Sequence, residues 1–215
     1  AQVWRYELSV SSGTSKFVKS PISIGDAGNV QAGAMTFYGN MVFVPSGTDR
    51  KLGVYYLFDP VSGYSTQGSV TWMDDSSREL YIRSLWFSGS TLYILGTEGS
   101  DTGSVTLYQC NYRFVNSNLG LQLSVLSSVV LQTTGSEVAA RILNVEDAVI
   151  TVGVSQGEVY PMVWRGYMSS LTSGMPYAIG DSRLFVEMGT VDYNLGVIYG
   201  LSNSNPSAQD TLVYE

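Results

Sequence analysis

The sequence predicts an all-β fold built from four repeated antiparallel units, and three observations point to it. No stretch of ten or more residues has convincing helical periodicity. Short runs rich in Val, Ile, Tyr, Leu and Trp alternate along the 215 residues, separated by Gly, Ser, Asn and Asp. Similar runs return at a spacing of roughly fifty residues, which indicates an internal repeat.

Each unit opens with a predicted hairpin whose turn carries Gly, Asn, Asp or Glu. Gly and Asn accept the positive φ that tight hairpin turns require. The first strands of the four units are predicted at 34–37, 84–87, 141–144 and 184–187, and the second strands at 41–44, 92–95, 149–152 and 196–199. Third strands follow at 54–58, 105–108, 161–164 and 211–214, and weaker fourth strands at 68–72, 128–131 and 177–179.

Four-stranded antiparallel units at this period are the sequence signature of β-propeller blades. We therefore expect one domain over residues 1–215, with blades at 30–73, 80–132, 137–180 and 182–215. The last blade has three strands, so we expect residues 2–10 to complete it and close the ring, which would remove two sheet edges. The main alternative fold is a β-sandwich.

The two ends of the chain allow a second interpretation. The run 3–8 followed by 16–19 has the pattern of a third and a fourth strand in sequence. In that case one strand is surplus, and the chain is part of a longer blade array or lends a strand to a neighbour. An unpaired terminal strand is a template for β-strand addition.

The segment 57–63, Leu-Phe-Asp-Pro-Val-Ser-Gly, resembles the turn between third and fourth strands in kelch-like and quinoprotein-like propellers. There Asp accepts backbone hydrogen bonds, Pro fixes φ, and Gly takes the left-handed position. The match covers one unit of four, and neither a Trp-Asp dipeptide nor a double-Gly kelch signature is present. The resemblance therefore implies the architecture and names no family.

Composition narrows the range of functions. Charged residues make up 13% of the chain, about half the usual share, and the net charge is −7. The 11 Lys and Arg are scattered, which argues against a nucleic-acid partner, and no segment is long enough to span a membrane. Low charge with many Ser, Thr, Gly and Tyr is typical of extracellular, cell-surface or virion-surface proteins. Cys110 lies in a strand-like run and is expected to be a buried core residue.

The chain contains no His, which removes most acid–base, nucleophilic and His-containing metal schemes. We expect no cofactor, no metal site and no catalytic residue, and the chain is interpreted as a non-enzyme. Carboxylates are the remaining candidates, because some propellers are glycosidases that use channel acids. Those considered are Asp74, Asp75, Glu137, Glu146, Asp147, Asp181, Glu187 and Asp192.

Six residues are candidate binding groups. Arg83, Arg141 and Arg183 each open or precede the first strand of a unit, where they would ring one mouth of a channel and hold an anion. Glu187 lies within an apolar first strand. Trp86 and Trp164 could stack on sugars, although Trp in strands more often packs between sheets.

Two functions from different classes remain. The first is a non-enzymatic scaffold at an extracellular or cell or virion surface, which binds a protein partner or assembles with itself as an assembly or adhesion subunit. The alternative is a carbohydrate-binding, lectin-like module or a propeller glycosidase that uses channel carboxylates.

Overall fold

The structure is a computed structural model. It describes the backbone of 2–5, 8–11, 14–17, 22–26, 35–46, 52–62, 65–100, 104–132, 138–156, 159–173, 177–178, 185–192, 197–205 and 208–214. Side chains are described for 35–46, 52–62, 65–100, 104–131, 140–154 and 162–173. Over these residues the chain is all-β, without a helix, as predicted. The part of the chain so described accordingly holds no helix long and apolar enough to cross a membrane.

Three antiparallel meanders of four strands follow one another along the chain. The first is β5 (Thr36–Tyr38), β6 (Met41–Ser46), β7 (Val54–Phe58) and β8 (Ser65–Trp72). The second is β9 (Leu80–Ser88), β10 (Thr91–Glu98), β11 (Val105–Val115) and β12 (Gly120–Gln132). The third is β13 (Val138–Glu146), β14 (Val149–Gln156), β15 (Val159–Gly166) and β16 (Tyr177–Ala178).

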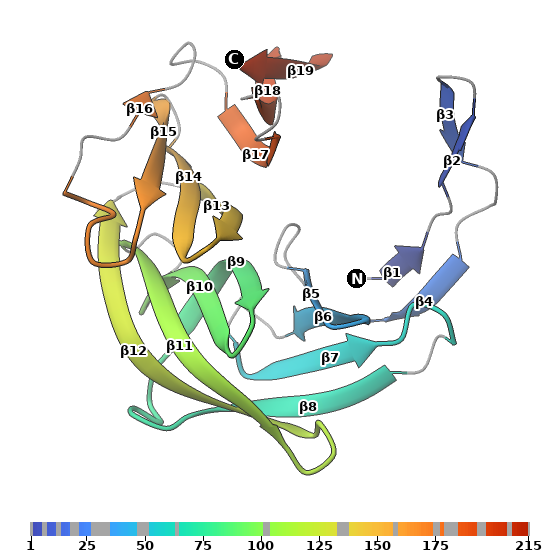
Figure 1. Cartoon of the computed structure of the whole chain (residues 1–215), viewed down its shortest axis with the longest axis vertical. Helices are drawn as coiled ribbons and strands as arrows, with labels where there is room; N and C mark the ends of the chain where they lie inside the picture. The colour runs from blue at the N-terminus through green and yellow to red at the C-terminus, as the bar shows by residue number, and fades with distance from the viewer. Residues whose placement is uncertain are drawn as a thin grey trace.

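A three-stranded sheet ends the order, with β17 (Phe185–Asp192), β18 (Val197–Asn205) and β19 (Ala208–Tyr214). The sheets follow one another along an open arc (Figure 1). The first strands of consecutive meanders contact each other, β5 with β9 and β9 with β13, and β13 also contacts β17 of the last sheet. The predicted hairpin turns at Gly39 and Gly89 are confirmed, and both glycines have the positive φ that the prediction required, 55° and 58°.

The first two meanders form one eight-stranded mixed sheet, in the order β5-β6-β7-β8-β12-β11-β10-β9. Its only parallel pairing joins β8 to the start of β12, with Ser69 beside Gly120 and Trp72 beside Leu123. Since β5 and β9, at the two ends of this order, also contact each other, the sheet curls back nearly into a barrel.

The tip of the long β11–β12 hairpin docks on the first meander. Asn116, Ser117 and Asn118 at the tip have positive φ. The hydroxyl of Tyr55 on β7 donates a hydrogen bond to the Asn118 carbonyl at 2.5 Å. Backbone hydrogen bonds from Ser69 to the carbonyl of Leu119, at 3.1 Å, and from Met73 to that of Leu123, at 2.8 Å, continue the contact.

The second meander is buried on both faces. One core, which includes Phe43, Tyr55, Leu92, Ile94 and Leu123, lies between it and the first meander. The other core lies between it and the third meander, and its buried members are Tyr93, Leu95, Val105, Leu107, Ala140, Ile142, Val145, Ile150, Val152, Val154, Trp164 and Leu171. Consecutive residues of β10 therefore alternate between the two cores, as the period of two in a strand requires.

A register shift in β12 fits that strand to both cores. Gln109 of β11 pairs with Ser127 and Cys110 pairs with Val125, so Leu126 is an extra residue in β12. Such a bulge reverses the side-chain alternation beyond it. Val125 accordingly packs on the first core, whereas Val129 packs on the second.

The N-terminal strands pair differently from the prediction. Residues 2–10 were expected to complete the last sheet, but β1 (Gln2–Arg5) pairs with β4 (Ile22–Asp26), and β2 (Leu8–Ser11) pairs with β3 (Thr14–Phe17). Within the described strands, β19 pairs with β18 alone. Pairing close in sequence closes a much shorter loop than pairing across the chain, so its entropic cost is smaller.

Candidate interaction surface

Two of the three predicted arginines lie on neighbouring first strands. Arg83 is on β9 and Arg141 on β13, and these strands contact each other. The backbone N–H of Ile142 donates to the hydroxyl of Ser84 at 3.0 Å, which links the two strands directly beside both arginines. Arg83 is 4% exposed and Arg141 is half-buried, and both make interactions within the protein. Arg183, the third arginine, lies outside the described residues.

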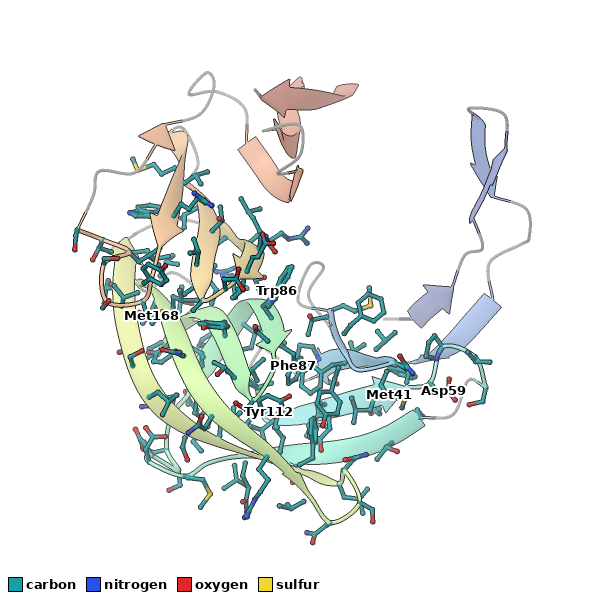
Figure 2. The ribbon with its side chains drawn as sticks, viewed as in Figure 1. Met41, Asp59, Trp86, Phe87, Tyr112 and Met168 are labelled. Carbon is teal, nitrogen blue, oxygen red and sulfur yellow. The ribbon has the colours of Figure 1, made fainter. Side chains whose placement is uncertain are left out.

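The two candidate tryptophans pack in the core. Trp164 on β15 is buried in the core between the second and third meanders, and Trp86 on β9 packs against the same core. Figure 2 shows Trp86 and its neighbour Phe87 on opposite sides of β9, with Phe87 directed toward Tyr112. In this arrangement Trp164 offers no open face to a sugar. Glu187 lies on β17, but its side chain is outside the described part of the protein.

Arg78 is the centre of a polar and aromatic cluster that the sequence did not indicate. Its guanidinium lies over the rings of Trp72, at 4.9 Å, and Tyr108, at 5.6 Å. It pairs with Asp74 at 2.7 Å and with Glu98 at 3.4 Å, and the Tyr108 hydroxyl donates a hydrogen bond to Glu98. The cluster ties the β8–β9 connection to β10 and β11, so its role is structural.

Burial governs the ionisation of this cluster. It raises the pKa of the Tyr108 phenol, which the hydrogen bond to Glu98 raises further, and it raises the pKa of the nearby Cys110 thiol to about 12. Desolvation lowers the pKa of Arg78, but the hydrogen bond and charge of Asp74, together with the charges of Tyr108 and Glu98, outweigh it and leave that pKa raised. Arg78 therefore stays charged and Cys110 stays protonated at neutral pH, which makes the thiol a poor nucleophile.

Two carboxylates hold turns together, and one of them, Asp75, is among the candidates. Asp75 accepts hydrogen bonds from the Ser77 N–H at 2.9 Å and the Ser77 hydroxyl at 2.6 Å. Asp59, in the segment that resembles a propeller turn, accepts in the same way from Val61 and Ser62. These hydrogen bonds, led in each case by the serine hydroxyl, lower the pKa of both carboxyls. Over the described residues, no group of three or more Cys, Asp or Glu is placed to hold a metal ion.

The most unusual surface is the outer edge of β12. After Leu123 this edge has no strand partner among the described residues, because β8 pairs only with 120–123. Two large apolar side chains along it, Leu126 and Val130, are 53% and 55% exposed. Residues 120–132, Gly-Leu-Gln-Leu-Ser-Val-Leu-Ser-Ser-Val-Val-Leu-Gln, contain no charge and no Pro. β12 runs along the outside of the arc in Figure 1.

Natural proteins protect edge strands with charges, Pro, bulges or short length. β12 has bulges, but no charge and no Pro, and it is 13 residues long. The sequence did contain a signal for this edge, namely a long uncharged run in a chain that has 18 acidic residues. The uncharged run is visible in the sequence, but its position at a sheet edge is not, because no local pattern indicates which strand of a unit lies at an edge.

Comparison with known proteins does not assign the chain to a family. No protein-family model and no curated protein sequence matches the chain. A solved structure titled "NanB plus Optactamide" aligns with a TM-score of 0.47 and 12% sequence identity. The alignment covers 86% of this chain and 29% of that one, so this chain spans less than a third of the structure it matches.

Proposed function

We propose that this chain is a non-enzymatic scaffold of the β-propeller type, which serves as an assembly or adhesion subunit at an extracellular, cell or virion surface. The observation that carries the proposal is the bare, uncharged edge of β12 with its exposed Leu126 and Val130. An edge of this kind is a site for protein contacts through strand addition.

The order of the sheets supports the propeller over the β-sandwich. A sandwich has two packed layers, whereas here the second meander has one core against the first meander and another against the third. The contacts of β5 with β9, β9 with β13 and β13 with β17 support an arrangement of blades around a common axis.

The polar groups of the described residues support a non-enzymatic role. Asp74 and Glu98 pair with Arg78, and Asp59 and Asp75 bind backbone N–H groups in turns. Each of these carboxylates has a structural partner, and each pairing is satisfied without a substrate. The surface location rests on composition, with 13% charged residues and a net charge of −7.

The test compares protein association with carbohydrate chemistry in the same preparation. Sedimentation velocity is run on the native chain and on the double variant Leu126→Lys/Val130→Lys. Leu119→Lys/Val61→Lys is the matched control, because both of its positions are also exposed and apolar. We expect association in the native chain and the control, and its loss in the first variant. Binding to a glycan array or hydrolysis of glycosides, equal in all three proteins, would instead support the carbohydrate alternative.

A further inference from the structure

We infer that β12 pairs antiparallel with β12 of a second copy of this chain, about a two-fold axis at Ser128. This inference rests on the proposed function and gives it a partner and a register. The edge beyond Leu123, which has no strand partner among the described residues, provides the backbone groups, and the uncharged sequence of β12 suits a second copy.

The backbone groups of Ser128 face the free edge. The Leu123 carbonyl points outward, since it accepts from Met73 beside β8. Backbone groups in a strand alternate between its two edges, and the extra residue at Leu126 shifts this alternation by one. Beyond the bulge, Ser127 and Val129 therefore point to β11, whereas Ser128 and Val130 point outward.

The edge is complementary to itself about Ser128. In an antiparallel pair centred there, Ser128 lies opposite Ser128 of the partner copy, and Ser127 lies opposite the partner's Val129 on either side. Hydroxyl pairs directly across an antiparallel ladder are stabilising. The side chains of Leu126, Ser128 and Val130 are the exposed ones of this stretch, and Ser127, Val129 and Leu131 are half-buried.

Charge explains why this edge suits two identical chains. Each copy has a net charge of −7, so two copies repel each other over most of their surfaces. Residues 120–132 carry no charge, which makes this strand a place where two copies can meet without opposing carboxylates.

The bulges limit the length and strength of the contact. Thr106 pairs with Val130 and Val105 with Gln132, so Leu131 is a second extra residue, and the regular stretch is 127–130. Pairing over so few residues buries less than a standard interface of about 1,600 Å². We therefore expect a dimer with a dissociation constant on the order of micromolar or weaker.

The experiment is disulfide trapping of the full chain with Ser128→Cys. A hydrogen-bonded antiparallel pair places the two Cα atoms about 5.5 Å apart, within disulfide range. Ser76→Cys, in an exposed turn, is the matched control, and the native chain reports on the buried Cys110. Under mild oxidation we expect about tenfold more covalent dimer from Ser128→Cys than from either control. Val130→Lys, measured by sedimentation, is expected to weaken the dimer about tenfold, because it places a charge on the uncharged edge of each copy.

Two results would overturn the inference, and they have different consequences for the proposed function. If the native chain associates but Ser128→Cys traps no more dimer than Ser76→Cys, assembly uses another surface and the proposed function stands. If the native chain stays monomeric at high concentration, the second copy is not the partner. If an extended segment of another protein then protects the amides of the same edge from exchange, that protein is the partner and the proposed scaffold function stands.

Discussion

The ring of Tyr55 lies across the backbone of Gly68, its direct partner on the neighbouring strand. A Cβ added at Gly68 would stand 2.3 Å from the Cζ atom of that ring. Tyr55 cannot retreat easily, because its hydroxyl is bonded to Asn118 and its ring stacks on Phe43 at 5.2 Å. The pair thus holds the first meander against the β11–β12 hairpin.

Gly68→Ala should therefore destabilise the protein by about 2 kcal/mol, the cost typical of overpacking a core. Urea unfolding measures it. Gly53→Ala is the control, because a Cβ there meets nothing within 4 Å, and it should change the free energy of unfolding by less than about 1 kcal/mol. Equal effects from the two substitutions would show that the Tyr55 ring does not fill the space above Gly68.

Ser84→Ala tests the link between β9 and β13. The Ser84 hydroxyl accepts the hydrogen bond of the Ile142 N–H at a buried position. Removing the hydroxyl leaves this buried N–H without its acceptor. The expected loss is about 1–3 kcal/mol in urea unfolding. Ser90→Ala, in the exposed β9–β10 turn, should have little effect, and an equally small effect of Ser84→Ala would rule out the link.

The repeat and its hairpins could be predicted because their signals are local. Gly39 and Gly89 provide positive φ at the two-residue turns, and alternating apolar residues mark the strands on either side. The pairing of β8 with β12 could not be predicted, because the register of strands so far apart in sequence is set by tertiary packing. The pairing of β1 could not be predicted for the same reason. Both the last sheet, which was expected to receive residues 2–10, and β4, which pairs with β1, offered a plausible strand.

Stability should fall at alkaline pH. The ordinary pKa of a cysteine thiol is 9.0, and burial raises the pKa of Cys110 to about 12 in the folded protein. Between those values the folded state holds a proton that the unfolded chain has released, so the free energy of unfolding declines as pH rises. Burial also raises the pKa of Tyr55 to about 12, which adds to the decline above about pH 10.

Urea midpoints measured at intervals from about pH 8 to about pH 11 check this expectation. Cys110→Ala should be less stable at about pH 8, because it leaves a cavity, but should lose less stability than the native chain between about pH 9 and pH 11. Parallel curves for the two proteins would mean that the thiol is not held protonated by the fold.

Association should strengthen as salt is added. Two copies with a net charge of −7 each repel, and the proposed contact contains no ion pair for salt to weaken. Raising NaCl from about 50 mM to about 500 mM should therefore lower the dissociation constant in sedimentation equilibrium. Weaker association at high salt would indicate an interface held by opposite charges.

For the candidate sites, the sequence was informative about residue types and less so about positions. Arg83 and Arg141 lie on adjacent strands, but each lies within its strand rather than at its start, and the sequence pattern gave no sign of their burial. Trp164 is buried because it lies where the second and third meanders pack, and that contact exists only in the folded chain.

Amide hydrogen exchange in β12 tests assembly through this edge most directly. The N–H groups of Ser128 and Val130 face the free edge, whereas that of Val129 faces β11. We predict that exchange at Ser128 and Val130 slows when the protein concentration is raised about a hundredfold, while Val129 is protected throughout. Exchange at Ser128 and Val130 that is fast and independent of concentration would contradict assembly through this edge.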